Sequence, residues 1–186
     1  MKIKFSDVLV YRLIQKQWVV GLKSAIENLL AMPIKKQQLN YDVTSRLKNA
    51  VNALTKDYEE QRVAMLAAHS KEKEVEFKSG KKLKTKFKLI EAAKDAEDYI
   101  VKVDGKKSPS KMAVKENHYD VIDIAALTAA HEELLNVEVE FNAYKLKLSR
   151  FEGEDLAWKD ANGNVRSVSL GDLEIFIEND LELVEE

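Results

Sequence analysis

Six residues between Leu47 and Met65 recur at alternating intervals of four and three, the spacing of one face of a long α-helix. The set consists of Leu47, Val51, Leu54, Tyr58, Gln61 and Met65. Charged side chains fill many of the intervening positions, as expected for a helix with one solvated face. We therefore predict a helix over residues 41–69, about 42 Å long at about 1.5 Å per residue. We expect Leu47, Val51, Leu54 and Tyr58 to contact either an earlier helix or a second copy of the chain.

An earlier helix is predicted from a broad apolar stripe that starts at Val8, after a plausible N-cap at Ser6-Asp7. Pro33 should end this helix near Ala31, because proline provides no amide to continue the hydrogen bonding. Two helices with a short connection form an antiparallel pair most simply. The expected fold class is α+β, with a long antiparallel helical hairpin over residues 1–70.

A mixed domain with antiparallel strands is expected over residues 71–186. Glu74–Phe77 and Leu83–Leu89 alternate apolar and polar residues on either side of a Ser-Gly turn, which indicates a β-hairpin. The stretch that follows predicts a helix over residues 90–99, a loop containing Gly105 and Pro109, and a helix that is capped by Asp120 or Asp123 and ends at Asn136.

The last third of the chain alternates again. Val137–Phe141 and Tyr144–Leu148 are predicted strands, with a bend between them that absorbs a one-residue change of phase. An Asn-Gly pair at residues 162 and 163 favours a tight hairpin turn. Ser169 resembles the start of a capping box and predicts a last short helix through Ile177.

Charge is distributed unevenly along the chain. Residues 152–186 hold 11 acidic and 2 basic side chains, a net charge of −9, whereas residues 1–151 carry a net charge of +7. Segments of opposite charge attract each other. The acidic segment is therefore expected to fold onto its own body or to contact another copy. We expect Leu156 to Ile177 to be folded and residues 178–186 to form a short acidic extension that touches a neighbouring copy.

Lysines crowd the predicted hairpin, where eight of them fall within 18 residues. The candidate interaction residues are Lys81, Lys82, Lys84, Lys86 and Lys88, together with Leu47, Val51, Leu54 and Tyr58 of the predicted helix. The hairpin lysines could hold nucleic acid, bind a protein with an acidic face, or form a solvated strand surface that prevents aggregation. The segment contains no arginine, the usual reader of bases, so an acidic protein partner is favoured over nucleic acid.

The residue types do not favour an enzyme, a metal centre or a cofactor site. Cysteine is absent and the three histidines lie far apart in sequence. His131-Glu132-Glu133 lacks the second histidine of a zinc-protease helix, and residues 160–164 lack the spacing of a calcium loop. Neither a signal peptide nor a membrane-spanning stretch of about 20 apolar residues is apparent. We expect a cytoplasmic protein without cofactors.

The layout of the chain resembles that of small uncharacterised proteins of tailed bacteriophages. The resemblance rests on a short leader into the predicted helical hairpin, on Tyr119–Asp123 running into a helix that ends Glu132–Leu135, and on the strands Val137–Val139 and Leu146–Leu148. It implies a non-enzymatic product located in the host cell cytoplasm or the virion. The expected function is protein–protein interaction, as a phage structural or assembly component that acts in multiple copies as a homo-oligomer. The alternatives are an inhibitor that binds a host defence protein or nucleic-acid enzyme, and direct nucleic-acid binding.

Overall fold

The computed structural model of the protein describes residues 1–14 and 17–180. The chain forms two compact units, each treated separately below. The terminal unit combines Met1–Tyr58 with Leu135–Glu186, and the inserted unit is Glu59–Leu134. These bounds differ from the division into residues 1–70 and 71–186 that the sequence suggests.

The predicted helix from Val8 to Ala31 is wrong. After the short strand β1 (Lys2–Lys4) and the single helical turn α1 (Phe5–Val8), the chain forms an antiparallel ribbon of β2 (Leu9–Ile14) and β3 (Gln17–Leu22). Only α2 (Ser24–Ala31) is helical, and it ends before Pro33 as expected. The ribbon is rich in valines and aromatic residues, which favour strands, and a near-continuous apolar run suits either structure.

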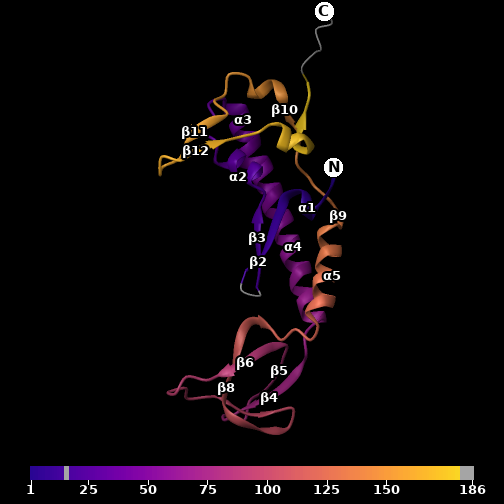
Figure 1. Cartoon of the computed structure of the whole chain (residues 1–186), viewed down its shortest axis with the longest axis vertical. Helices are drawn as coiled ribbons and strands as arrows, with labels where there is room; N and C mark the ends of the chain where they lie inside the picture. Colours follow the sequence, from indigo (N-terminus) through magenta and orange to yellow (C-terminus); the bar gives the residue numbers. More distant parts are fainter. Residues whose placement is uncertain (15–16, 181–186) are drawn as a thin grey trace, which may run out of the picture. The chain divides into compact units, whose positions relative to one another are not determined.

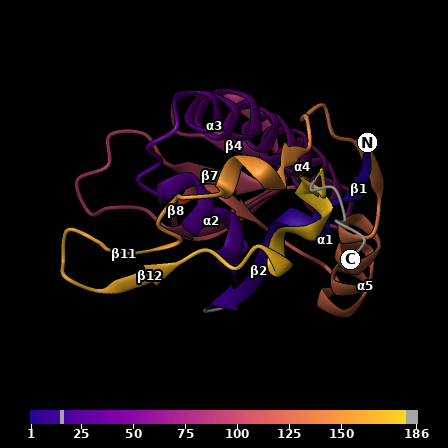
Figure 2. The same ribbon diagram turned by 90° about the horizontal axis from the view of Figure 1, so that it is seen from above.

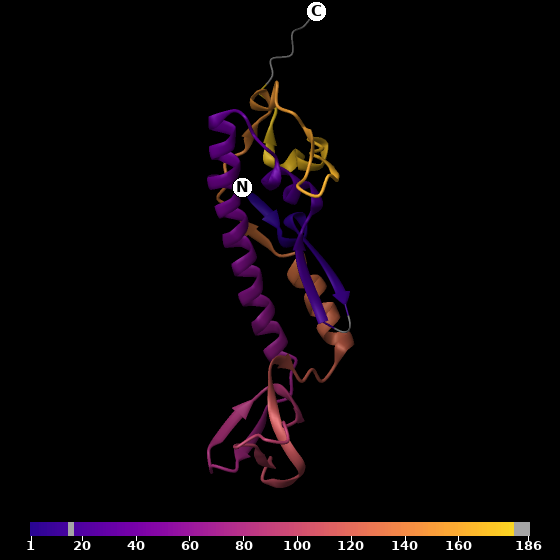
Figure 3. The same ribbon diagram turned by 90° about the vertical axis from the view of Figure 1, so that its left-hand side faces the viewer.

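The second predicted helix is present and is longer than expected. It runs through α3 (Gln37–Tyr41), the π-helical segment η1 (Asp42–Leu47) and α4 (Lys48–Ala68), which together make 32 residues (Figure 3). The preceding helix, α2, has only eight residues. The predicted long antiparallel helical hairpin is therefore wrong.

The apolar face of this helix lies in the core of the terminal unit. Leu47, Val51, Leu54 and Tyr58 are each at most 4% exposed. The Tyr58 ring contacts Phe5 edge to face, with ring centroids 5.4 Å apart. The chain's own residues thus bury this face, and its part in binding a second copy stays a prediction.

The inserted unit is built on a five-stranded antiparallel sheet of order β5-β4-β7-β8-β6 (Figure 1). Its strands are β4 (Lys73–Phe77), β5 (Lys82–Thr85), β6 (Phe87–Glu91), β7 (Ile100–Val103) and β8 (Lys106–Tyr119). The predicted hairpin is confirmed as β4 and β5, but the strand expected to continue to Leu89 breaks at Lys86. Lys86 alone separates β5 and β6, which lie at opposite edges of the sheet, so the sheet must roll up to bring these edges close.

Two further expectations for the inserted unit are wrong. The segment 90–99 contains no helix, and the region expected to be a loop is mostly strand. Asp104 and Gly105 have positive φ values of 49° and 74° and make a tight turn from β7 into β8. The next helix is confirmed: α5 (Ile124–Leu135) follows Asp123, whose carboxylate accepts hydrogen bonds from two backbone amides of the first turn.

Short paired strands complete the terminal unit. β9 (Glu138–Glu140) pairs with β1, β10 (Leu146–Lys147) pairs in parallel with β13 (Ile177–Glu178), and β11 (Ala157–Lys159) pairs with β12 (Val165–Ser167) (Figure 2). The predicted turn between the last two strands is confirmed, with Gly163 at φ 82°. The predicted Ser169 cap is wrong, because the 3-10 helix η3 (Gly171–Phe176) follows Leu170 and has no side-chain cap.

Much of the acidic segment folds onto the basic N-terminal part of the same unit. The buried Glu154 carboxylate accepts hydrogen bonds from the backbone amides of Lys35 and Lys36, at 2.9 and 2.7 Å. Asp155 forms an ion pair with the Lys35 ammonium group. Within the described residues up to Asp180, these contacts inside one chain thus account for part of the opposite charges of the acidic segment and the rest of the chain. The end of the predicted acidic extension, residues 181–186, lies outside the described residues.

Candidate interaction surface on the inserted unit

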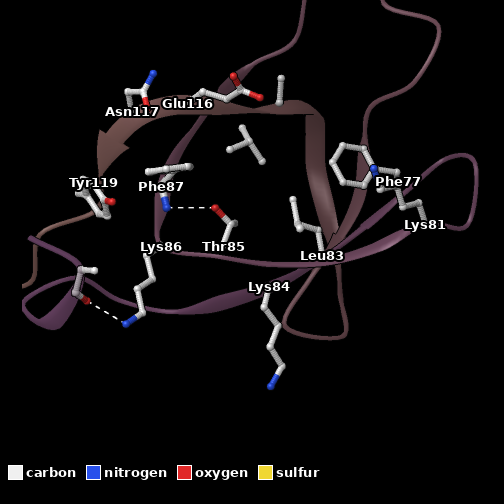
Figure 4. Close-up of a pocket in the computed structure, with 13 residues that line it drawn as sticks. Phe77, Lys81, Leu83, Lys84, Thr85, Lys86, Phe87, Glu116, Asn117 and Tyr119 are labelled. Carbon is white, nitrogen blue, oxygen red and sulfur yellow. Dashed lines mark hydrogen bonds between the residues drawn. The ribbon is translucent and has the colours of Figure 1, made fainter. Parts of the chain in front are cut away.

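An open pocket of about 640 Å³ lies on the rolled sheet of the inserted unit (Figure 4). We call it the β5 pocket. Apolar and aromatic side chains make up much of its lining, including Phe77, Leu83, Phe87, Val114 and Tyr119. The pocket exists because the sheet is rolled, which brings residues of β5, β6 and β8 around one space.

Strand alternation determines which β5 side chains reach the pocket. Leu83 and Lys84 point to opposite sides of the strand (Figure 4). Leu83 lines the pocket and is 40% exposed, so this wall is apolar and open to solvent. Thr85, two residues on, is buried. Lys82 and Lys84 are both exposed on the other side of β5, and Lys84 also contributes to the rim of the pocket.

The five candidate lysines do not form one equivalent group. Lys81, Lys82, Lys84 and Lys88 are exposed. Lys86 is half-buried and donates a hydrogen bond of 2.9 Å to the Ala67 carbonyl oxygen in the last turn of α4. A cation at a helix C-terminus is favourable, because the final carbonyl groups lack helical partners and carry partial negative charge. We therefore assign Lys86 a structural role.

One edge of the sheet adds backbone groups to this surface. β5 is the outermost strand and, within the described part of the chain, β4 is its only partner in the sheet. An edge strand presents backbone donors and acceptors that another extended chain can bind, and lysines are a common protection against unwanted pairing. The sequence indicated the lysines but not this edge, because strand order depends on residues far apart in the chain.

An internal ion pair and a capped turn hold the β4–β5 hairpin in place. The Lys73 ammonium group lies 2.6 Å from the Asp120 carboxylate, and only 9% of the Lys73 side chain is exposed. At the hairpin turn, Ser79 donates backbone and side-chain hydrogen bonds of 3.0 and 2.7 Å to Asp98. These bonds lower the pKa of Asp98. Sequence analysis missed both contacts, since their partners are 47 and 19 residues apart.

His131 is a titratable group of the inserted unit with a strongly lowered pKa. It is 0% exposed, and burial, together with the nearby Arg62 cation, lowers its pKa from 6.5 to about 4. Within residues 1–14 and 17–180, no three His, Asp or Glu side chains are grouped so as to hold a metal ion. His131 is therefore a core residue of the inserted unit.

The described residues form no helix that is long and apolar enough to cross a lipid bilayer. The chain matches no protein-family model, no curated protein and no solved structure. The surface around the β5 pocket must therefore be interpreted from its own geometry and chemistry.

Proposed function

We propose that the protein acts through protein–protein interaction, and that the β5 edge of the inserted unit binds an extended, acidic segment of a partner. The observation that supports this proposal is the combination of an open strand edge, an apolar pocket on one side of β5, and exposed lysines on the other. In strand addition, backbone hydrogen bonds supply affinity and alternate side-chain contacts supply specificity. An acidic partner suits Lys82 and Lys84.

A protein partner suits this surface better than nucleic acid does. Single-stranded nucleic acids bind through bases stacked on exposed aromatic faces. Phe87 and Tyr119 instead pack against each other edge to face, with ring centroids 4.9 Å apart. Lys78 and Lys111 both lie over the Tyr99 ring, at 5.6 and 4.9 Å from its centroid. These rings already have partners in the inserted unit.

The proposal extends to a role as a structural or assembly component of a tailed bacteriophage, acting in multiple copies in the host cytoplasm or the virion. Its support is the opposite charges of the two parts of the chain and the remaining part of the resemblance to small phage proteins, which covers the segment from Tyr119 to Leu148 and no longer includes a helical hairpin. A non-enzymatic component of this kind needs surfaces that bind other proteins, and the β5 edge is such a surface.

The test is the molecular mass in solution, measured by light scattering over a range of concentration and salt. The mass of the full chain should rise with concentration and fall with added salt, which screens exposed charges. A variant with Lys82→Glu and Lys84→Glu should remain monomeric. A control with Lys94→Glu and Lys106→Glu, which changes the charge equally at exposed positions outside the pocket lining, should associate like the parent. A parent that is monomeric throughout, or a Lys82/Lys84 variant that associates normally, would refute the proposal.

A further inference from the structure

The chain itself contains a segment with the chemistry that the β5 edge requires. Residues 181–186 read Leu-Glu-Leu-Val-Glu-Glu, so the segment is acidic and begins with alternating apolar and charged residues. The segment follows Asp180 directly. Asp180 accepts hydrogen bonds of 2.9 and 2.6 Å from the backbone amide and hydroxyl group of Ser149, so the chain is held at this point.

The two alternating patterns match each other. In a strand beside β5, Leu181 and Leu183 would lie on one side and Glu182 on the other, because successive side chains point to opposite faces. β5 likewise has Leu83 on one side and Lys84 on the other (Figure 4), and alternation places Lys82 on the same side as Lys84, which also reaches the pocket rim. Cross-strand pairs of apolar residues and pairs of opposite charge both stabilise neighbouring strands. A single register therefore matches both sides of β5 over residues 181–183, whereas Val184 would share the lysine side and Glu185 the pocket side.

We infer that residues 181–186 of one copy add as a strand to β5 of a second copy, with Leu181 and Leu183 entering the β5 pocket and Glu182 facing the exposed lysines. The inference rests on the proposed function and names the partner segment. The bound segment and the receiving edge are different parts of the chain. Such a contact builds a ring or an open filament, or a closed dimer when two copies exchange their segments.

Each contact of this kind is small. Six residues bury far less area than the interface of a stable complex, so a single contact is weak and depends on concentration. Its ionic part also weakens as salt rises, because exposed charges are screened within about 8 Å at physiological ionic strength. Weak contacts repeated along an assembly act together, as multivalent binding requires.

The experiment combines two variants that are each defective in one half of the contact. The first is cut after Asp180, which removes the segment but keeps the Asp180 contact with Ser149. The second carries Lys82→Glu and Lys84→Glu, which alters the receiving edge but keeps the segment. Each alone should be monomeric by light scattering. Their equimolar mixture should form a 1:1 complex of one 21.2 kDa chain and one slightly lighter truncated chain, and should grow no further.

Two more variants separate the apolar and charged contributions. Leu181→Ser with Leu183→Ser keeps every charge and should reduce self-association at all salt concentrations, because it removes the pocket contacts. Glu182→Gln should reduce self-association at low salt and match the parent at high salt, where the ionic contribution is screened. Far-UV circular dichroism should show the same spectrum for all variants.

The outcomes distinguish this inference from the proposed function. If the truncated chain associates like the parent while the Lys82/Lys84 variant does not, the β5 edge still binds a partner but residues 181–186 are not that partner. If both variants associate like the parent, both proposals fail. If the mixture stays monomeric, the inference is overturned. Binding of the segment within its own chain would also give this result.

Discussion

Protonation of His131 should set the acid stability of the inserted unit. The imidazole lies on α5, is 0% exposed, and has a pKa lowered from 6.5 to about 4 by burial and by the Arg62 cation. The folded protein therefore holds the neutral ring. As pH falls, the unfolded chain takes up this proton before the folded one does, so acid favours unfolding.

The magnitude follows from the two pKa values. Each tenfold difference in proton affinity corresponds to about 1.4 kcal/mol, so the difference between 6.5 and about 4 amounts to about 3 kcal/mol. This penalty should be absent well above pH 6.5 and should grow progressively as the pH falls to about 4, below which it stays constant. Asp98, Asp160 and Asp180, whose pKa values lie below 3.8, lose their contribution only in more acidic solution.

Urea denaturation at several pH values between about 7 and about 4 tests this expectation. The free energy of unfolding of the parent is compared with that of His131→Leu and His131→Gln, neither of which titrates in this range. Either replacement can change stability at neutral pH, so the informative quantity is the change with pH. Both variants should lose about 3 kcal/mol less than the parent over this range. If all three proteins lose stability in parallel, His131 is not the group responsible.

Three further substitutions test the core and two polar contacts. Leu54→Ala should lower the free energy of unfolding by about 2 to 5 kcal/mol, because Leu54 is 4% exposed, whereas Asn52→Ala at an exposed position should change it by less than about 0.5 kcal/mol. Equal denaturation midpoints for these two variants would contradict the buried helix face. Glu154→Gln should cost about 1 to 3 kcal/mol in chemical denaturation, since the buried carboxylate accepts two backbone amides, and a cost near zero would mean that those bonds contribute little. Lys86→Met should lower the thermal midpoint but leave self-association unchanged. Lys84→Met should leave the thermal midpoint unchanged but weaken self-association. If Lys86→Met instead weakens self-association without lowering the thermal midpoint, Lys86 belongs to the binding surface.

Local signals in the sequence were sufficient for several elements. The interval pattern from Leu47 onward predicted the long helix, because a 3.6-residue period reflects the geometry of the helix itself. The sequence offered Asp120 or Asp123 as the cap of α5, and the structure shows that it is Asp123. The Asn162-Gly163 pair predicted a hairpin turn, because these residues favour a particular backbone conformation within a few residues of themselves. Lysine positions on β5 could likewise be predicted, since alternation places them on one side of a strand.

The tertiary structure decided what such local signals leave open. The apolar run before Leu22 is compatible with a helix or a ribbon, and strand pairing selected the ribbon. The Lys73–Asp120 pair and the rolled order of the sheet join residues that are distant in sequence, so no local pattern indicates them. The candidate surface also depends on contacts between distant residues. The lysines on β5 can be predicted from the sequence, whereas the open edge and the pocket exist only because Lys86 turns the chain between two strands at opposite edges of one sheet.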